Sequence, residues 1–454
     1  MTPFQRFKKE YSGKHVLIMG LGLQGRGVQD AEFFASIGAE VTVTDLKNED
    51  QLAPSLRKLQ SYNIRYVLGK HEEEDFRGHD MVLRNADVPR ESPYLAIARK
   101  AHIPIEMDEA LFASFVTPKK LIGITGTRGK TTTTMLIYSV LSSFFPHVLL
   151  GGNIKGVATL PLLPHVKEDS RIVLELSSWQ LQGFAWRGIS PHVAVWTNIY
   201  EDHLNRYKDM NAYIQDKKAI YQSQQQKDML VLSKKDPIVS NFFDEAKGKV
   251  FFFESDDVPT SWNLRVKGIH NKENIAAAMR VGRLFRIPLS KMRTVIESFK
   301  GVEERLEEIA SIHGIIFVDD TTSTTPIAGL KALEAYEDVP IILLAGGASK
   351  DLNLSPFAQK IATQVKAVFL LSGTATKGLE QDIIRYGGQK KIYGIFDRFE
   401  QAVRKAYSVA KKGDVILLSP GCASFGLFQN EFDRGEQFQQ IVENIADEEK
   451  KSNR

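Results

Sequence analysis

The chain has 454 residues, a length that predicts about three domains. Hydrophobic residues make up 43% of it and charged residues 25%, which is ordinary for a soluble globular protein. The net charge of +4, from 59 basic and 55 acidic residues, is too small to indicate a nucleic-acid partner.

Hydropathy and cysteine content indicate neither a membrane protein nor a disulfide-bonded one. No uninterrupted apolar run approaches the roughly 20 residues that span a bilayer, and the polar residues 1–14 lack the core of a signal peptide. Cys422 is the single cysteine, so no disulfide within the chain is possible. These features predict a cytoplasmic enzyme.

Short apolar runs alternate with helical stretches along nearly the whole chain. Runs of Val, Ile and Leu without polar alternation are typical of buried parallel strands, and we expect them at 15–19, 41–44, 81–83, 121–124, 172–176, 193–196, 315–318, 341–344, 368–371 and 415–418. Two more runs, 229–232 and 250–253, resemble strands that extend a sheet edge. The fold class is therefore α/β, with expected domains at 1–107, 108–301 and 302–454.

A glycine-rich turn follows the first expected strand. Gly20-Leu21-Gly22-Leu23-Gln24-Gly25 matches G-x-G-x-x-G, and Asp45 ends the next strand, 20 residues after Gly25. Taken alone, this pattern predicts a dinucleotide such as NAD. Its physical content is broader, because a tight turn before a helix N-terminus suits any diphosphate, including that of UDP. A turn that only packs is a third alternative.

A second glycine-rich turn lies between the apolar run 121–124 and a predicted helix at 132–141. Its sequence is Thr125-Gly126-Thr127-Arg128-Gly129-Lys130-Thr131, which differs from a Walker A loop because Ile124 stands where that loop has glycine. Glycines let backbone N–H groups approach phosphate oxygens. Lys130 can reach the β- and γ-phosphates and the Thr131 hydroxyl can bind Mg²⁺, so the turn predicts nucleotide binding.

Polar clusters follow the later strands of this central region. They are Gly151-Gly152-Asn153, the segment from Glu175 to Gln180, and the segment from Asn198 to His203. Because Mg²⁺ prefers oxygen ligands, Glu175 is a candidate ligand beside Thr131, with a helix-capping carboxylate as the alternative. A single histidine such as His203 is more often structural, and the ammonium of Lys217 is not a metal ligand.

These clusters, taken together, resemble the Mur ligase family, the ATP-dependent amide ligases of peptidoglycan precursor synthesis. Further matching motifs hold the same order from about residue 13 to 440, and they lie at 270–274, 304–307, 319–326, 346–350, 418–425 and 434–435. The run Leu-Ser-Pro-Gly-Cys-Ala-Ser-Phe at 418–425 with the later Arg434-Gly435 most resembles the members that add D-glutamate. The resemblance links the chain to cell-wall biogenesis, cell shape and cell division.

The resemblance implies a Rossmann-like N-terminal domain that holds UDP, a central P-loop ATPase-like domain and a C-terminal Rossmann-like domain. It favours UDP over NAD at the first turn. The implied UDP-sugar contacts are Gly22, Leu23, Gln24, Asp45, Arg84 and Asn153. The implied ATP contacts are Gly126, Thr127, Gly129, Lys130, Thr131, Thr132, Asn271, Asn274, Arg305 and Asp320. The implied amino-acid contacts are Thr324, Lys350 and Ser424.

The resemblance also implies the metal chemistry. Two Mg²⁺ ions would be held by Thr131, Glu175, His203 and Lys217. Lys217 aligns with a lysine that the family carbamylates, and a carbamate is an anionic oxygen donor where an ammonium is not. Lys218 is the neighbouring alternative for this modification. Lys130, His203 and Lys217 are the catalytic residues that this resemblance implies.

The implied reaction joins D-glutamate to UDP-N-acetylmuramoyl-L-alanine in two steps. The L-alanine carboxylate attacks the ATP γ-phosphate, and the D-glutamate amine then displaces phosphate from the acyl phosphate. We expect a monomer whose partners are these small molecules. Two alternatives stay open: another Mur-family substrate pair, such as L-alanine addition or glutamate addition to folate, and a catalytically idle homologue that serves as a partner subunit.

Three residues depart from the family pattern, and all of them concern the substrates. Arg84-Asn85-Ala86 stands where Ser-Pro-Gly is usual, and Arg84 could pair with a diphosphate or be a surface arginine. Thr322 replaces a lysine that helps to hold ligand. Glu431 stands where an aromatic residue is usual, although Phe432 could fill that role. These departures therefore bear on the choice of substrates and not on the binding of ATP.

Overall fold

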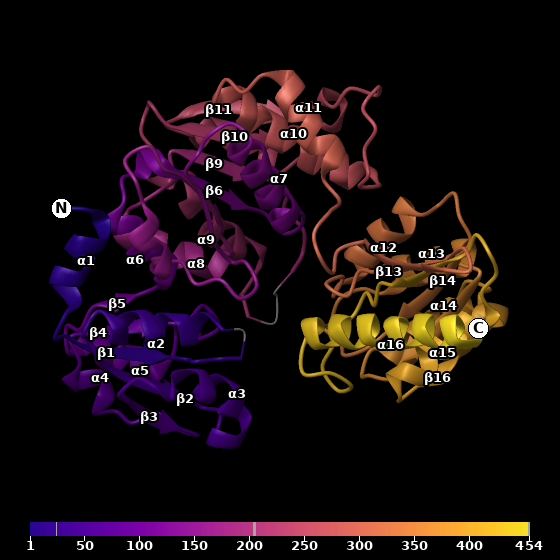
Figure 1. The fold of residues 1–454 in the computed structure, drawn as a ribbon, viewed down its shortest axis with the longest axis horizontal. Helices are drawn as coiled ribbons and strands as arrows, with labels where there is room; N and C mark the ends of the chain where they lie inside the picture. Colours follow the sequence, from indigo (N-terminus) through magenta and orange to yellow (C-terminus); the bar gives the residue numbers. More distant parts are fainter. Residues whose placement is uncertain (24, 203–205, 453–454) are drawn as a thin grey trace. The chain divides into compact units, whose positions relative to one another are not determined.

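The computed structural model describes residues 1–23, 25–202 and 206–452, and their strands form three sheets (Figure 1). The described residues divide into two compact units. The first holds the first two sheets and comprises residues 1–202, 207–257 and 273–295, with the gap at 24. The second, which holds the third sheet, includes residues 258–272 and 296–452.

The first sheet is parallel, with the strand order β3-β2-β1-β4-β5. Its strands are β1 (His15–Met19), β2 (Glu40–Asp45), β3 (Ile64–Leu68), β4 (Met81–Arg84) and β5 (Ile105–Glu106). The chain runs outward from β1 in both directions, so the crevice between the carboxyl ends of β1 and β4 is where such a sheet binds ligands. Its helices are α1 (Pro3–Tyr11), α2 (Arg26–Ser36), α3 (Glu49–Leu59), α4 (Asp75–Gly78), α5 (Pro93–Lys100) and α6 (Asp108–Phe115).

The second sheet is also parallel, with the order β11-β10-β9-β6-β8-β7. Its strands are β6 (Leu121–Thr125), β7 (Val148–Gly152), β8 (Arg171–Glu175), β9 (Val193–Trp196), β10 (Met229–Ser233) and β11 (Lys249–Phe253). Its helices are α7 (Lys130–Ser142), α8 (Ser178–Arg187), α9 (Met210–Gln222), α10 (Ile269–Leu284) and α11 (Leu289–Ser298). β6 lies between β8 and β9, so the ends of these three strands lie side by side.

The third sheet has the order β12-β13-β17-β14-β15-β16, in which only β12 runs antiparallel among the described strands. Its strands are β12 (Glu307–Ile312), β13 (Ile315–Asp319), β14 (Ile341–Ala345), β15 (Ala367–Leu371), β16 (Ile392–Phe396) and β17 (Val415–Leu418). Its helices are α12 (Pro326–Ala335), α13 (Ser355–Gln364), α14 (Thr376–Arg385), α15 (Phe399–Val409) and α16 (Glu431–Ser452).

The α/β prediction is confirmed, and every expected apolar run forms a strand. The two runs expected at a sheet edge are β10 and β11, at the end of the second sheet. The predicted domain boundaries at 107 and 301 stay predictions. Among the described helices, none has both the length and the apolar character needed to cross a membrane.

Candidate active site

The predicted phosphate loop joins β6 to α7, and two of its glycines are required by their surroundings. A Cβ atom at Gly126 would lie 1.9 Å from the Thr197 hydroxyl, and one at Gly129 would lie 2.3 Å from the Asn274 Oδ1. Gly129 precedes α7 with a φ of 74°, in the left-handed region that disfavours side chains. The loop therefore leads tightly into a helix N-terminus, the arrangement that binds phosphate.

Side chains after the neighbouring strand β9 hold this loop in shape. The Thr197 hydroxyl donates to the Arg128 carbonyl at 2.7 Å, and the Asn198 amide group both donates to that carbonyl at 3.0 Å and accepts from the Arg128 N–H at 2.8 Å. Lys130, the first residue of α7, donates to the Thr127 carbonyl at 3.1 Å. The loop is therefore ordered by protein contacts.

Sequence reasoning assigned no role to Thr197 or Asn198. The signal available was their place directly after β9, the strand next to β6. Thr131 and Thr132 lie where predicted, in the first turn of α7.

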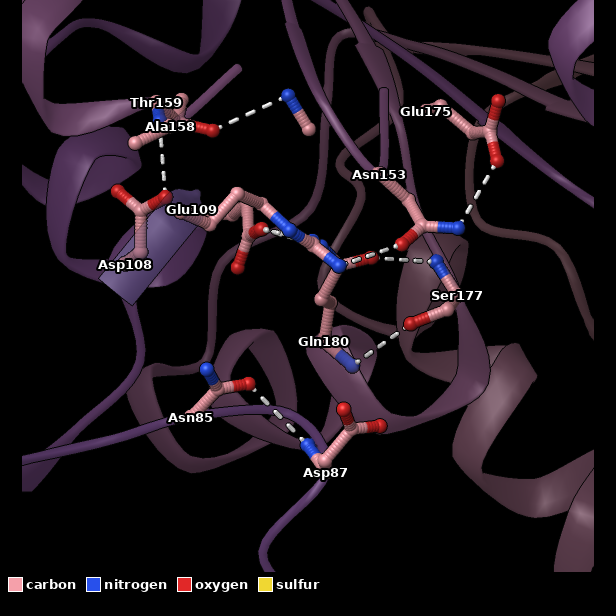
Figure 2. A network of polar contacts seen from close by, with 12 residues as sticks. Asn85, Asp87, Asp108, Glu109, Asn153, Ala158, Thr159, Glu175, Ser177 and Gln180 are labelled. Carbon is pink, nitrogen blue, oxygen red and sulfur yellow. Dashed lines mark hydrogen bonds and ion pairs between the residues drawn. The ribbon is translucent and has the colours of Figure 1, made fainter. Parts of the chain in front are cut away.

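Glu175 ends β8, directly beside the strand that carries the phosphate loop. The register pairs Glu175 with Ile124, and the Glu175 side chain is 1% exposed. Its Oε1 accepts from the Asn153 side-chain amide at 3.1 Å, as Figure 2 shows. Its Oε2 is buried and has no hydrogen-bond partner among the described residues. A buried carboxylate oxygen without a donor is suited to a cation.

Lys217 lies on α9 and is also 1% exposed. Its ammonium donates to the Gly126 carbonyl at 2.8 Å and lies 3.4 Å from the Thr125 hydroxyl, so it sits beneath the phosphate loop. Burial, with a further contribution from Lys130, holds the pKa of Lys217 well below its usual value. The predicted residue is therefore next to the loop and is driven toward the neutral amine.

The neighbouring Lys218 is engaged elsewhere. Its ammonium lies 2.6 and 2.7 Å from the two oxygens of Glu245 and stacks over the Phe242 ring. These contacts favour Lys217 over Lys218 as the lysine of the site. His203, which is also a predicted metal ligand, lies outside the described residues.

Asn274, on α10, packs against the phosphate loop at Gly129, and its Oδ1 accepts from the Thr133 hydroxyl at 3.1 Å. Asn271, one turn earlier on α10, lines a cavity of about 440 Å³ that belongs to the second compact unit. Arg305 lines the same cavity, together with Arg265, Lys267, Lys300 and Tyr336. Glu303, Glu307 and Glu308 line it too, so two of the predicted ATP contacts share a cavity with both basic and acidic side chains.

Two buried carboxyl groups lie at the carboxyl end of β13, where Asp319 is the last residue of the strand and Asp320 follows it. Asp320 accepts from Ser419 at 2.8 Å, and from Ser323, and burial raises its pKa to about 6. Asp319, which sequence reasoning left without a role, accepts from the Thr321 N–H at 2.9 Å, and burial raises its pKa to about 7. The predicted ATP contact Asp320 is therefore fixed by two hydroxyl donors.

The predicted amino-acid contacts come together at the carboxyl end of the third sheet. The Lys350 ammonium donates to the Thr324 hydroxyl at 3.0 Å. An antiparallel bridge between Ala348 and Ala423 places the Lys350 segment beside Ser424. The Ser424 hydroxyl is buried and has no hydrogen-bond partner among the described residues. An unpaired hydroxyl next to a lysine is suited to a carboxylate ligand.

The first glycine turn also precedes a helix, since Gly25 stands directly before α2. The Asp45 Oδ2 accepts from the backbone N–H groups of Leu21 and Gly22 at 2.9 and 3.1 Å, and its Oδ1 accepts from Lys47. The carboxylate therefore holds the turn. In a dinucleotide site it would face a ribose. Leu23 is exposed, and Gln24 lies outside the described residues.

Arg84 is not a surface residue, and that interpretation is wrong. It is 2% exposed, and it donates to the Val88 carbonyl and to the Gln182 side-chain oxygen, each at 2.8 Å. Burial lowers its pKa to about 10. Gln182 in turn donates to Asp216 at 2.6 Å. Arg84 thus links the end of β4 to α8 directly and to α9 through Gln182. Local sequence does not reveal these contacts.

The other two departures have structural explanations. The Thr322 hydroxyl donates to the Glu304 carbonyl at 3.0 Å. Glu431 is the first residue of α16, where a carboxylate is favoured by the partial positive charge of the helix N-terminus. The Thr321 hydroxyl donates to the Glu431 carbonyl at 2.8 Å.

Comparison with known proteins identifies the chain. Residues 124–276 match the model of the Mur ligase middle domain, and residues 304–422 match that of the Mur ligase glutamate ligase domain. A relative from Roseiflexus sp. (strain RS-1), named UDP-N-acetylmuramoylalanine--D-glutamate ligase, is 40% identical over 96% of this chain and 100% of that protein. The chain belongs to the Mur ligase family. A relative of the same name from Borreliella burgdorferi (strain ZS7) is 35% identical over 96% of this chain and 99% of its own.

Solved Mur ligases share the fold at lower identity. The UDP-N-acetylmuramate-alanine ligase from Thermotoga maritima is 18% identical with a TM-score of 0.63, over 95% of this chain and 100% of that one. A MurF ligase from the same organism, in complex with ADP, is also 18% identical, with a TM-score of 0.60 over 97% of both chains. The predicted family and the predicted enzyme class, a ligase, are thus confirmed.

Proposed function

We propose that this Mur ligase uses ATP to join D-glutamate to UDP-N-acetylmuramoyl-L-alanine. The observation that carries the proposal is that Glu175, at the end of β8, and Lys217, on α9, both lie beside the phosphate loop that follows β6. The names of the relatives from Roseiflexus and Borreliella support D-glutamate as the added amino acid. The ADP complex of the Thermotoga MurF ligase supports nucleotide binding by this fold.

The residues at the loop fit Mg²⁺. Glu175 offers a buried oxygen with no donor among the described residues, and the Thr131 hydroxyl lies in the first turn of α7. Within the described part of the chain, no three His, Cys, Asp or Glu side chains gather as a metal site. A set that holds two ions therefore needs other donors, and we assign these to His203 and to a modified Lys217. Bound Mg²⁺ would neutralise charge on the phosphates.

Carbamylation turns Lys217 into such a donor. The neutral amine attacks carbon dioxide, an N–C bond forms and a proton leaves, which gives an anionic carbamate. Burial favours the neutral amine that this step needs. The neighbouring Lys218 ammonium instead pairs with Glu245.

The chain's own groups support the two chemical steps. Lys130 and the N-terminus of α7 hold the ATP phosphates and favour attack by the L-alanine carboxylate on the γ-phosphate. The product is an acyl phosphate, whose carbonyl the D-glutamate amine attacks with release of phosphate. Lys350, Thr324 and Ser424 would hold the D-glutamate carboxylates. Asn271, Asn274, Arg305 and Asp320 would bind the rest of ATP.

The first glycine turn and Asn153 would bind the nucleotide sugar. Arg84 has two acceptors within the chain, so its contribution to the diphosphate would be indirect. We expect the enzyme to act as a cytoplasmic monomer, without a nucleic-acid partner.

A panel of amino acids tests the substrate assignment. Phosphate release from ATP should require both UDP-N-acetylmuramoyl-L-alanine and D-glutamate. Turnover with a different amino acid instead would contradict D-glutamate as the substrate but would still support the ligase activity. Absence of turnover with every amino acid and nucleotide sugar, while ATP still binds, would favour an idle homologue.

A matched pair of lysine variants tests the carbamate. Lys217→Ala should abolish turnover, and short carboxylic acids should restore part of it. Lys218→Ala, one residue away, should keep turnover, since Lys218 pairs with Glu245. Equal loss in both variants, or full activity of Lys217→Ala, would remove Lys217 from the site.

A further inference from the structure

Glu175 belongs to a ring of polar contacts whose members come from distant parts of the chain. The ring closes through the backbone between Glu175 and Ser177. The Arg26 guanidinium, at the start of α2, donates through Nη2 to the Asn153 Oδ1 at 3.0 Å. The Asn153 Nδ2 donates to the Glu175 Oε1 at 3.1 Å, and the Asn153 backbone N–H donates to the Glu175 carbonyl at 2.8 Å. This half of the ring orients the Glu175 side chain.

The other half of the ring runs through the start of α8 (Figure 2). Ser177 and Gln180 form a reciprocal cap, in which each side chain accepts from the other residue's backbone N–H. The Gln180 side-chain amide donates to the Glu109 Oε1. The Arg26 Nη1 lies 3.5 Å from the same oxygen, which closes the ring. Glu175 is thus held through its side chain and through the segment that follows it.

Arg26 and Glu175 fix the orientation of the Asn153 amide from its two sides. A guanidinium can only donate, so the amide oxygen must face Arg26 and the amide nitrogen must face Glu175. This orientation satisfies Oε1 of Glu175 and leaves Oε2 as the buried oxygen without a donor among the described residues. Without Arg26, the amide oxygen loses its donor, and Glu175 alone orients the amide group.

Glu109, Glu175 and Gln180 are buried, whereas Arg26, Asn153 and Ser177 are partly exposed. The Arg26 and Glu109 side chains are 19% and 4% exposed. Two more buried carboxyl groups, Asp30 and Asp108, lie nearby, and burial, with Asp108 and Glu109 alongside, raises the pKa of Asp30. Asp108 accepts from the backbone N–H groups of Thr159 and Leu160 at 2.8 and 2.7 Å, so it is fixed independently of Arg26.

We propose that Arg26, anchored by Glu109, is a positioning residue that orients Asn153 and so leaves one oxygen of Glu175 directed to the metal. The inference rests on the proposed role of Glu175 as a Mg²⁺ ligand. Residues that orient a metal ligand commonly change metal affinity by about 10- to 100-fold when they are replaced. Arg26 touches neither metal nor substrate in this assignment.

Metal binding tests the inference without turnover. The probe is Mn²⁺, titrated into the full chain with ADP and followed by electron paramagnetic resonance. Arg26→Gln should weaken Mn²⁺ binding by about tenfold or more. The matched control is Arg187→Gln, because Arg187 also pairs with a carboxylate, Glu106 at 2.6 Å, but stands outside the ring. This control should bind Mn²⁺ as the unchanged chain does.

Two more variants separate the outcomes. Arg26→Lys keeps the charge opposite Glu109 but not the planar pair of donors, so it should also weaken Mn²⁺ binding, and it serves if Arg26→Gln does not fold. Unchanged Mn²⁺ binding in a folded Arg26 variant, or equal weakening in Arg187→Gln, would overturn the inference. If Glu175→Gln leaves Mn²⁺ binding unchanged, the proposed metal role itself fails. If Glu175→Gln weakens it and Arg26→Gln does not, only the role of Arg26 fails.

Discussion

Gly129→Ala should destabilise the second sheet and weaken nucleotide binding. The left-handed backbone costs about 1–2 kcal/mol for a residue with a Cβ atom. The new Cβ would also lie 2.3 Å from the Asn274 Oδ1, so Asn274 must move and give up its hydrogen bond from Thr133. That loss adds about 1 kcal/mol. The expected decrease in the free energy of unfolding is therefore about 2–3 kcal/mol.

Gly188→Ala is the matched control, because it has a φ of 61° and open space around its Cβ position. Only the cost of the left-handed backbone applies to this variant. Its free energy of unfolding should therefore fall by about 1 kcal/mol less than that of Gly129→Ala. Urea unfolding can be followed by the fluorescence of Trp179 and Trp196, which lie near the second sheet. ATP affinity should fall in Gly129→Ala and stay unchanged in Gly188→Ala. Equal destabilisation of the two variants would refute the predicted clash with Asn274.

Two further predictions concern buried charges. Arg84→Met should lower the free energy of unfolding by about 2–3 kcal/mol, because it leaves a partly buried acceptor on Val88 and a buried one on Gln182 without a donor. Exposed Arg77→Met should change the urea midpoint very little. Burial raises the pKa of Asp319 to about 7, so the folded chain keeps a proton that the unfolded chain releases. The free energy of unfolding should therefore fall by about 1 kcal/mol for each unit by which the pH rises from about 4 to 7. Asp319→Asn should flatten this dependence in urea titrations, and an unchanged slope would contradict the assignment.

The strands predicted from sequence are those with uninterrupted apolar runs, and most of them lie inside the sheets. β3 and β16 were missed because each is a sheet edge with exposed residues, Arg65 in β3 and Tyr393 and Ile395 in β16. β12 was missed for a similar reason, since its Glu307 and Glu308 leave it partly exposed at an antiparallel edge. An edge strand buries too little apolar surface to stand out in a sequence.

The sequence predicted that Glu175 would lie beside the phosphate loop, because neighbouring parallel strands end at the same edge of a sheet. It could not show that Asn153 links Glu175 to Arg26, since Arg26 and Asn153 lie more than a hundred positions apart in the sequence. Nor could it show that Arg84 is buried, because that burial depends on α8 packing against the end of β4. Long-range packing decides the orientation of side chains that spacing alone only brings near.

The Asp45 carboxylate has a consequence for the kinetics of ligand binding. It holds the backbone of Leu21 and Gly22 through two hydrogen bonds from within the chain. The backbone of these two residues is therefore fixed before a ligand binds, so binding there costs the protein little conformational entropy. Association should accordingly proceed in a single phase at this turn, without a slow rearrangement after the first encounter.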